Sequence, residues 1–136
     1  MLQKLNSRRG GFTLVEIMIV VAIIALLATI AVPNFLRARL RSQATACKQD
    51  LRMLDAAIEQ YAIENNKVST SAVAFADLKG YIKENSPLYS NGGTDTLGNT
   101  ITLSTVGAGV RVPTATATAV ADVIDPVFFS PYLPAR

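Results

Sequence analysis

The pattern of hydrophobic and polar positions is dominated by one apolar run, residues 12–32, which a single charged residue, Glu16, interrupts. At about 1.5 Å per residue this run would form a helix about 31 Å long, close to the thickness of a bilayer's hydrocarbon core. The segment before it is short and polar, and its charges are Lys4, Arg8 and Arg9. Because positive charges favour the cytoplasmic side, we predict a membrane-inserted helix with a cytoplasmic N-terminus and an outward-facing C-terminus.

A second helical pattern follows Pro33, a residue that lacks an amide donor and kinks or breaks a helix interior. The apolar residues after it advance by steps of three or four, as one face of a helix requires. They are Leu36, Leu40, Ala44, Cys47, Leu51, Leu54, Ile58 and Tyr61. We therefore predict that the helix continues as an amphipathic segment over residues 34–66 and that a globular domain packs on this face. The position of Cys47 on that face predicts a buried structural thiol.

The remaining residues, 67–136, predict a small α+β head. A short second helix is indicated by the helical spacing of Phe75, Leu78, Tyr81 and Ile82. Residues 100–106 alternate between apolar and polar side chains, which is typical of a strand, and the glycines that follow would turn it into a partner strand. That partner would carry Val110 and Val112. The simplest head is thus an antiparallel β-hairpin packed on the long helix.

Two C-terminal segments leave alternatives open. Residues 113–121, PTATATAVA, are low in complexity and could form an edge strand, a loop or an O-modified stretch. Residues 125–134 contain three prolines and three aromatic residues, which excludes a helix interior but supplies a large apolar surface. We interpret this tail as a strap over the core of the head, with a contact between subunits as the alternative.

The residues around Gly11 resemble the cleavage and methylation motif of the type IV pilin superfamily, which includes the pseudopilins of type II secretion. The resemblance rests on Gly11 before the cut, Phe12 after it, Glu16 inside the apolar run, and Pro33 near the end of that run. It implies that prepilin peptidase removes residues 1–11 as a leader and that Phe12 is then N-methylated. A secretory signal is built differently, because its apolar core precedes the cleavage site and is removed with it.

The resemblance also implies roles for two residues of the helix. Glu16 would pair with the new α-amine of a neighbouring subunit, set the register of assembly and be needed for methylation. The alternative is a glutamate on the first helical turn, where the helix dipole favours a negative charge. Pro33 would mark the place where the helix loosens on assembly, or else a fixed kink.

The implied architecture is a pilin-like lollipop, with a transmembrane and filament-core helix at residues 12–33, its amphipathic continuation at 34–66, and the head at 67–136. The implied partners are other copies of the chain in a filament, prepilin peptidase, the inner-membrane assembly platform, minor pilins or pseudopilins, and membrane lipid before assembly. The chain would be a single-pass protein of the bacterial inner membrane with a periplasmic head. It would later lie in a filament within the envelope or on the cell surface.

Charge and composition argue against several other functions. The net charge is +3, but removal of Lys4, Arg8 and Arg9 leaves 10 basic and 10 acidic residues, so nucleic acid is not an expected partner. One cysteine excludes an intrachain disulfide, and histidine is absent. A calcium loop would need several clustered oxygen ligands, whereas the C-terminal region offers only Asp122 and Asp125. We therefore predict no catalytic residues, no metal site and no cofactor, and interpret the chain as a structural protein.

Between the two kinds of filament, we favour a type II secretion pseudopilin that serves protein export. The lack of a disulfide pair, the small head and residues 95–99 favour it, because DTLGN is similar to the turn that opens the sheet of major pseudopilins. The missing acidic loop and the Ala/Thr-rich segment favour a type IV pilus subunit for adhesion, motility or DNA uptake. Two other classes remain open: a single-pass membrane-anchored binding module, and a small secreted protein cut after Ala31.

Overall fold

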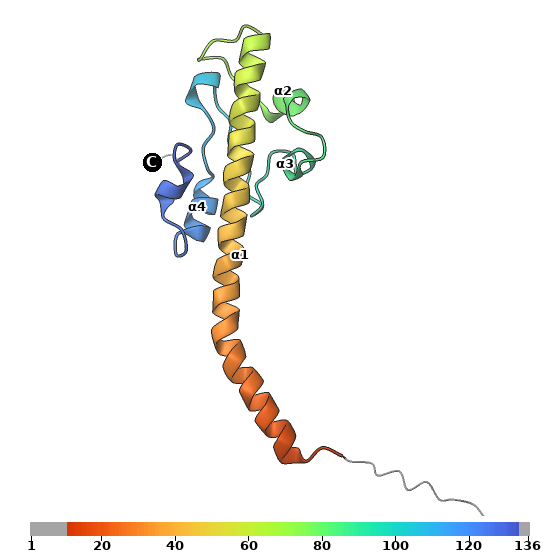
Figure 1. Ribbon diagram of the computed structural model, residues 1–136. Helices are drawn as coiled ribbons and strands as arrows, with labels where there is room; N and C mark the ends of the chain where they lie inside the picture. Colours follow the sequence, from red (N-terminus) through yellow and green to blue (C-terminus); the bar gives the residue numbers. More distant parts are fainter. Residues whose placement is uncertain (1–10, 134–136) are drawn as a thin grey trace, which may run out of the picture. The chain divides into compact units, whose positions relative to one another are not determined.

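The computed structural model describes residues 11–133, and most of its regular structure is one long helix (Figure 1). That helix, α1, spans Leu14–Glu64. The shorter elements are α2 (Phe75–Leu78), η1 (Lys79–Tyr81), α3 (Pro87–Ser90), η2 (Val106–Ala108), α4 (Thr114–Val120) and η3 (Pro126–Phe129). The chain divides into two compact units, Met1–Leu36 and Arg37–Arg136, here called unit 1 and unit 2.

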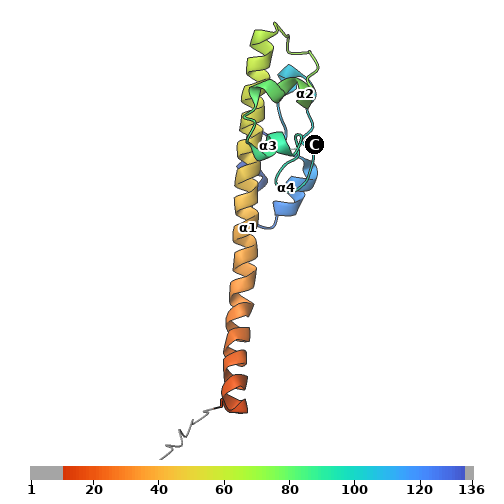
Figure 2. The ribbon, with the colours of Figure 1, turned by 90° about the vertical axis from the view of Figure 1, so that its right-hand side faces the viewer.

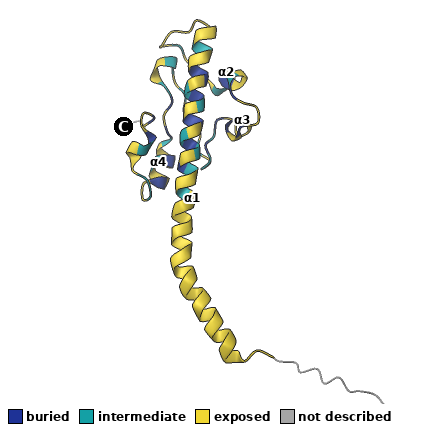
Figure 3. Cartoon of the chain, in the orientation of Figure 1, coloured by how far each residue is buried: buried dark blue, intermediate teal, exposed yellow. Residues whose placement is uncertain are grey.

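Unit 1 consists, in its described part, of the first turns of α1 and the three residues before them. Every residue from 11 to 36 is exposed (Figure 3). This part of α1 is long and apolar enough to cross a membrane. Pro33 lies inside α1 without ending it, because the helix continues to Glu64. The predicted long N-terminal apolar helix is confirmed, while the predicted effect of Pro33 stays a prediction.

Unit 2 is built on the second part of α1, and the predicted apolar face forms its core from Ala44 to Ile58, whereas Leu36 at the start of that face is 50% exposed. Ala44, Cys47, Leu51 and Leu54 are fully buried, and Ile58 is 2% exposed. The segments that cover this face contribute a second set of buried apolar residues: Val73, Leu78, Ile82, Leu88, Ile101, Val110, Val112, Val120, Phe129 and Tyr132. The amphipathic spacing therefore identified the surface on which the head packs.

The predicted short second helix is confirmed as α2 followed by η1. Leu78 is fully buried and Ile82, just after η1, is 4% exposed, while Phe75 and Tyr81 are half-buried against the core. The start of α2 is held by the carboxylate of Asp77, which accepts a hydrogen bond of 3.0 Å from the backbone N–H of Ala74.

The predicted antiparallel β head is not found: residues 11–133 contain no β-strand, only isolated bridges between Ala72 and Thr105 and between Thr94 and Thr100. Residues 100–105 form no helix, but their hydrogen-bond partners change along the segment. The N–H of Ile101 donates to the carbonyl of Gly93, while the N–H of Val73 donates to that of Ser104. Each pairing ends before a ladder forms.

The predicted hairpin partner is also wrong. Residues 106–108 form η2 in place of a tight turn, and Gly109 adopts a φ of +65°, which favours glycine. The N–H of Val112 then donates to the carbonyl of Tyr132, 3.0 Å away. Val110 and Val112 are buried as the apolar pattern suggested, but the backbone of Val112 pairs with the C-terminal tail and not with residues 100–106.

The Ala/Thr-rich segment forms helix α4, so the edge-strand and loop interpretations of residues 113–121 are wrong. Pro113 directly precedes the helix, a position where its fixed φ is tolerated. Thr116 and Val120 are four residues apart and both face the core, with exposed fractions of 0% and 1%. Two buried positions on a seven-residue helix do not produce a recognisable helical period in a sequence of alternating Thr and Ala.

The C-terminal tail packs over the head, as predicted. Phe129 is fully buried and Tyr132 is 8% exposed. The tail is tied to α1 by the ammonium group of Lys48, which donates to the carbonyl of Phe128, and by the Tyr132 hydroxyl, which lies 3.3 Å from a carboxylate oxygen of Asp55. Pro134 lies outside the described residues.

Candidate functional site

The junction between Gly11 and Phe12 is exposed and precedes the helix. Both residues lie outside regular secondary structure, and Phe12 is 82% exposed. A Cβ atom added to Gly11 would meet no atom within 4 Å in the described chain. The fold of unit 1 therefore does not require glycine at this position. Because the junction is exposed, a protease could reach the peptide bond.

Thr13 and Glu16 form a reciprocal cap at the start of α1. The carboxylate Oε2 of Glu16 accepts from the backbone N–H of Thr13 at 2.7 Å and from its hydroxyl at 2.8 Å. The Thr13 hydroxyl oxygen accepts from the N–H of Glu16 at 3.2 Å. This is a capping box, which satisfies backbone donors that a helix start otherwise leaves unpaired. The signal was present as Thr-x-x-Glu, but the sequence interpretation considered only the helix dipole.

In unit 2, the carboxylate of Asp95 joins three segments that are distant in sequence. Asp95 is 2% exposed. Its Oδ1 accepts from the backbone N–H groups of Leu97 and Asn99 at 2.9 and 2.8 Å, which closes the turn at residues 95–99. Its Oδ2 accepts from the hydroxyl of Thr116 on α4 and lies 3.8 Å from the thiol sulfur of Cys47 on α1. The turn singled out in the sequence thus anchors the head to α1.

Cys47 is buried beside two carboxylates and is not a reactive thiol. Burial, together with the negative charges of Asp95 and Asp50, raises the pKa of Cys47 to about 12. The thiol is therefore protonated at neutral pH, and the thiolate that oxidation and metal binding require is suppressed. The prediction of a buried structural thiol is confirmed.

Asp50 is the one polar group of this cluster that is incompletely satisfied. It is 7% exposed, and its Oδ2 has no hydrogen-bond partner among the described residues. Burial and, next in size, the charge of Asp95 raise the pKa of Asp50. The described part of the chain holds no group of three or more metal-ligating side chains, so this cluster lacks the ligands of a metal centre.

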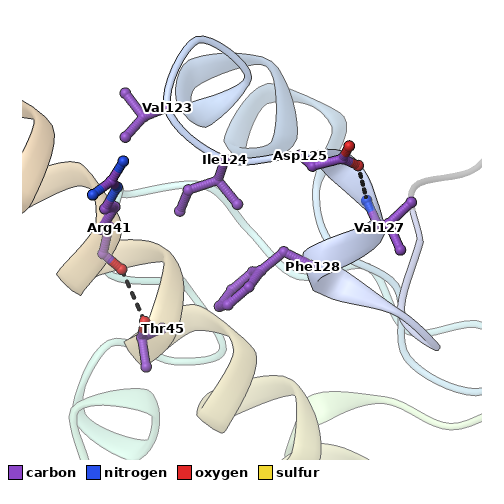
Figure 4. Close-up of a pocket in the computed structure, with 7 residues that line it drawn as sticks. All are labelled: Arg41, Thr45, Val123, Ile124, Asp125, Val127 and Phe128. Carbon is purple, nitrogen blue, oxygen red and sulfur yellow. Dashed lines mark hydrogen bonds between the residues drawn. The ribbon is translucent and has the colours of Figure 1, made fainter.

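A groove of about 710 Å³ opens between α1 and the segment 123–128 (Figure 4). Its lining is mainly apolar, and Val127 is 68% exposed beside it. Arg41 and Asp125 lie on opposite sides of the groove (Figure 4). The groove residues are Arg41, Thr45, Val123, Ile124, Asp125, Val127 and Phe128. Sequence analysis missed this surface because its two walls are about 80 residues apart in the chain.

Comparison with known proteins agrees with the geometry at the start of α1. The family model described as the prokaryotic N-terminal methylation motif matches residues 6–32, a range that contains the exposed Gly11–Phe12 junction and Glu16. This motif and the relatives described next support the type IV pilin superfamily for the N-terminal region. The matched range includes the described part of unit 1 up to Val32, and hence the apolar part of α1.

Relatives of two kinds match the chain. It is 42% identical over 79 residues to the type IV major pilin protein PilA of Myxococcus xanthus, which is 57% of this chain and 36% of that protein. It is 41% identical over 68 residues to the type IV wide pilus major component PilA4 of Thermus thermophilus, which is 50% of this chain and 52% of that protein. It is 33% identical over 66 residues to the type II secretion system core protein G of Aeromonas hydrophila, which is 48% of this chain and 46% of that protein.

The chain thus spans about half, or less, of the length of the curated relatives it matches. No solved structure matches the chain. The relatives are pilus and secretion-system components, so they support a structural subunit and do not separate the two systems.

Proposed function

We propose that this chain is a structural subunit of a type IV pilus-like filament and that it is processed between Gly11 and Phe12 before assembly. The observation that carries the proposal is the overlap of the methylation motif, residues 6–32, with an exposed junction directly before the membrane-length helix. In this proposal residues 1–11 are the leader, 12–33 the transmembrane and filament-core helix, 34–66 its amphipathic continuation, and 67–136 the head.

The proposed order of events follows from the exposed apolar surface of unit 1. Large apolar side chains at positions 12–36 are about 50–80% exposed in the single chain, so they need a bilayer or other copies of the same helix around them. The subunit would first reside in the inner membrane with its head outside. Prepilin peptidase would then remove the leader, Phe12 would be N-methylated, and an inner-membrane platform with minor subunits would draw the helix into a filament.

Glu16 is proposed as the assembly and register residue, in addition to its role as a helix cap. A charged carboxylate in an apolar helix costs about 3 kcal/mol at the bilayer centre and less near its edge, so a partner is favourable. Both hydrogen bonds from Thr13 use Oε2 of Glu16. Within the described residues this leaves Oε1 to accept from the α-amine of a neighbouring Phe12 without disrupting the cap. Pro33 is proposed as the site where α1 loosens on assembly.

Two filament systems fit this proposal. A type II secretion pseudopilus for protein export is supported by the single cysteine and by the anchoring turn at residues 95–99. A surface pilus is supported by the higher identity to pilus components, 42% and 41% against 33%. Deletion of the gene would decide between them: loss of exported proteins with normal surface filaments indicates the pseudopilus, and loss of surface filaments with normal export indicates the pilus.

The test of the common proposal is the intact mass and N-terminal sequence of the protein recovered from membranes. We expect a chain that starts at Phe12 and is one methyl group heavier than the unmodified polypeptide. A chain that starts at Met1 would instead support a membrane-anchored module, and one that starts near Val32 would support a secreted protein. Either result would overturn the filament proposal.

A further inference from the structure

A small apolar patch with two charges lies where α1 ends and the next loop begins. Ile63 is 78% exposed and Val68 is 64% exposed. Glu64 and Lys67 lie between them in the sequence and are also exposed. The loop is held to the helix by the N–H of Lys67, which donates to the carbonyl of Ala62 at 2.9 Å. We call Ile63, Glu64, Lys67 and Val68 the helix-end patch.

The helix-end patch and the groove lie at opposite ends of unit 2. Both views of the ribbon show the end of α1 far from α4 and the segment that follows it (Figures 1 and 2). The groove residue Thr45 and the patch residue Ile63 are separated by 18 positions of α1. At 1.5 Å per residue this is about 27 Å along the helix axis. The two surfaces therefore cannot meet within one copy.

The two surfaces complement each other in both polarity and charge. The patch presents two exposed aliphatic side chains, and the groove is lined mainly by Val123, Ile124, Val127 and Phe128. The patch carries Glu64 and Lys67, and the groove carries Arg41 and Asp125 on its two sides. Each charge of the patch thus has an opposite charge available at the groove, which favours one orientation of docking.

We propose that the helix-end patch of one copy docks in the groove of the next copy, with Glu64 beside Arg41 and Lys67 beside Asp125. The contact joins two different surfaces, so the same contact can be repeated from copy to copy. With the α1 helices parallel, as the proposed filament requires, it generates an open row of subunits with a step of about 27 Å along α1. This inference rests on the proposed filament function and adds the surfaces through which heads would contact each other.

The test is thiol crosslinking of the full-length chain in cells, with variants Ile63→Cys and Val127→Cys in one polypeptide. A short bismaleimide joins two thiols without a redox step, and the protonated, buried Cys47 does not compete. We expect a ladder of dimers, trimers and larger products from the double variant. Each single variant should give no ladder. The matched control is Ile63→Cys with Thr102→Cys, because Thr102 is exposed but lies outside the groove.

Absence of the ladder, or an equal ladder from the control pair, would overturn the contact. Efficient dimers from Val127→Cys alone would also overturn it, because they indicate a two-fold contact or another occupant of the groove. As a second measurement, Arg41→Glu should reduce the yield of ladder several-fold, and Arg41→Glu with Glu64→Arg should restore it. The mass of the same samples separates the two proposals: a chain processed at Phe12 without the ladder refutes only the contact, whereas an unprocessed chain refutes the filament function.

Discussion

Thr13 and Glu16 hydrogen-bond to each other in both directions at the first turn of α1. Glu16 therefore contributes to the single chain before any neighbour is present. Loss of an N-terminal cap typically costs about 1 kcal/mol of helix stability. Any experiment on Glu16 must separate this local effect from the proposed pairing with a neighbouring α-amine.

The first prediction separates those two roles. Glu16→Ala should leave cleavage intact but block incorporation beside wild-type subunits, because both the cap and the charge are lost. Glu16→Gln should keep the cap, since glutamine also serves in a capping box, but should still assemble poorly without the negative charge. The measurement is the fraction of each variant in sheared filaments, with processing checked by mass. Normal filaments from Glu16→Ala alone would rule out the assembly role.

The second prediction concerns maturation. Gly11→Val should stop processing, because the side chain would obstruct the peptidase, while the described fold of unit 1 has room for it. The membrane fraction should contain only the uncut chain, and hydrogen exchange of α1 should match that of the wild type. A processed Gly11→Val protein would show that glycine is not required at the cut.

The third prediction concerns the anchoring turn. Thr116→Val removes a hydroxyl that donates to the buried carboxylate of Asp95 and accepts from the amide of Asn99, and leaving such buried groups without this partner costs about 1–3 kcal/mol. We expect the free energy of unfolding of the full chain in detergent to fall by that amount. The control is Thr114→Val, because Thr114 is exposed on the same helix. Equal loss in both variants would mean that α4 propensity, rather than the hydrogen bond, is responsible.

The fourth prediction follows from the raised pKa of Asp50. The folded state holds the proton more tightly than the unfolded state, so this residue lowers stability as the pH rises above its ordinary value of 3.8. Asp50→Asn should therefore raise the melting temperature at pH 7, and the gain should shrink as the pH falls through the raised pKa of the folded state toward 3.8, below which it should be lost. Asp122→Asn is the matched control, because Asp122 is exposed. A gain that does not depend on pH would contradict this explanation.

The sequence was informative where one element determines its own pattern. The burial of Cys47 and Leu51 was predictable from helical spacing alone. The apolar run around Glu16 was recognisable from its length and from the lack of other charges in it. It was less informative where a segment depends on its partner. The alternation at residues 100–106 indicates that one face is buried, but it does not indicate which segment lies beside the backbone. For the same reason, the hydrogen bond between Val112 and Tyr132 was not predictable from the sequence. The groove was missed for the same reason, because Arg41 and Phe128 line one surface only in the folded chain.

The absence of a strand ladder from residues 37–133 has a consequence for how such a head can evolve. In a sheet, an insertion in one strand shifts the register of its neighbours. Here the covering segments are held to α1 and to one another by scattered contacts, with anchors such as Asp95 and Phe129, and share no strand register. A loop can therefore lengthen, shorten or change its surface chemistry while the other anchors keep their places. We expect a head of this design to tolerate changes in loop length and surface chemistry more readily than a sheet does, because no shared register is disturbed.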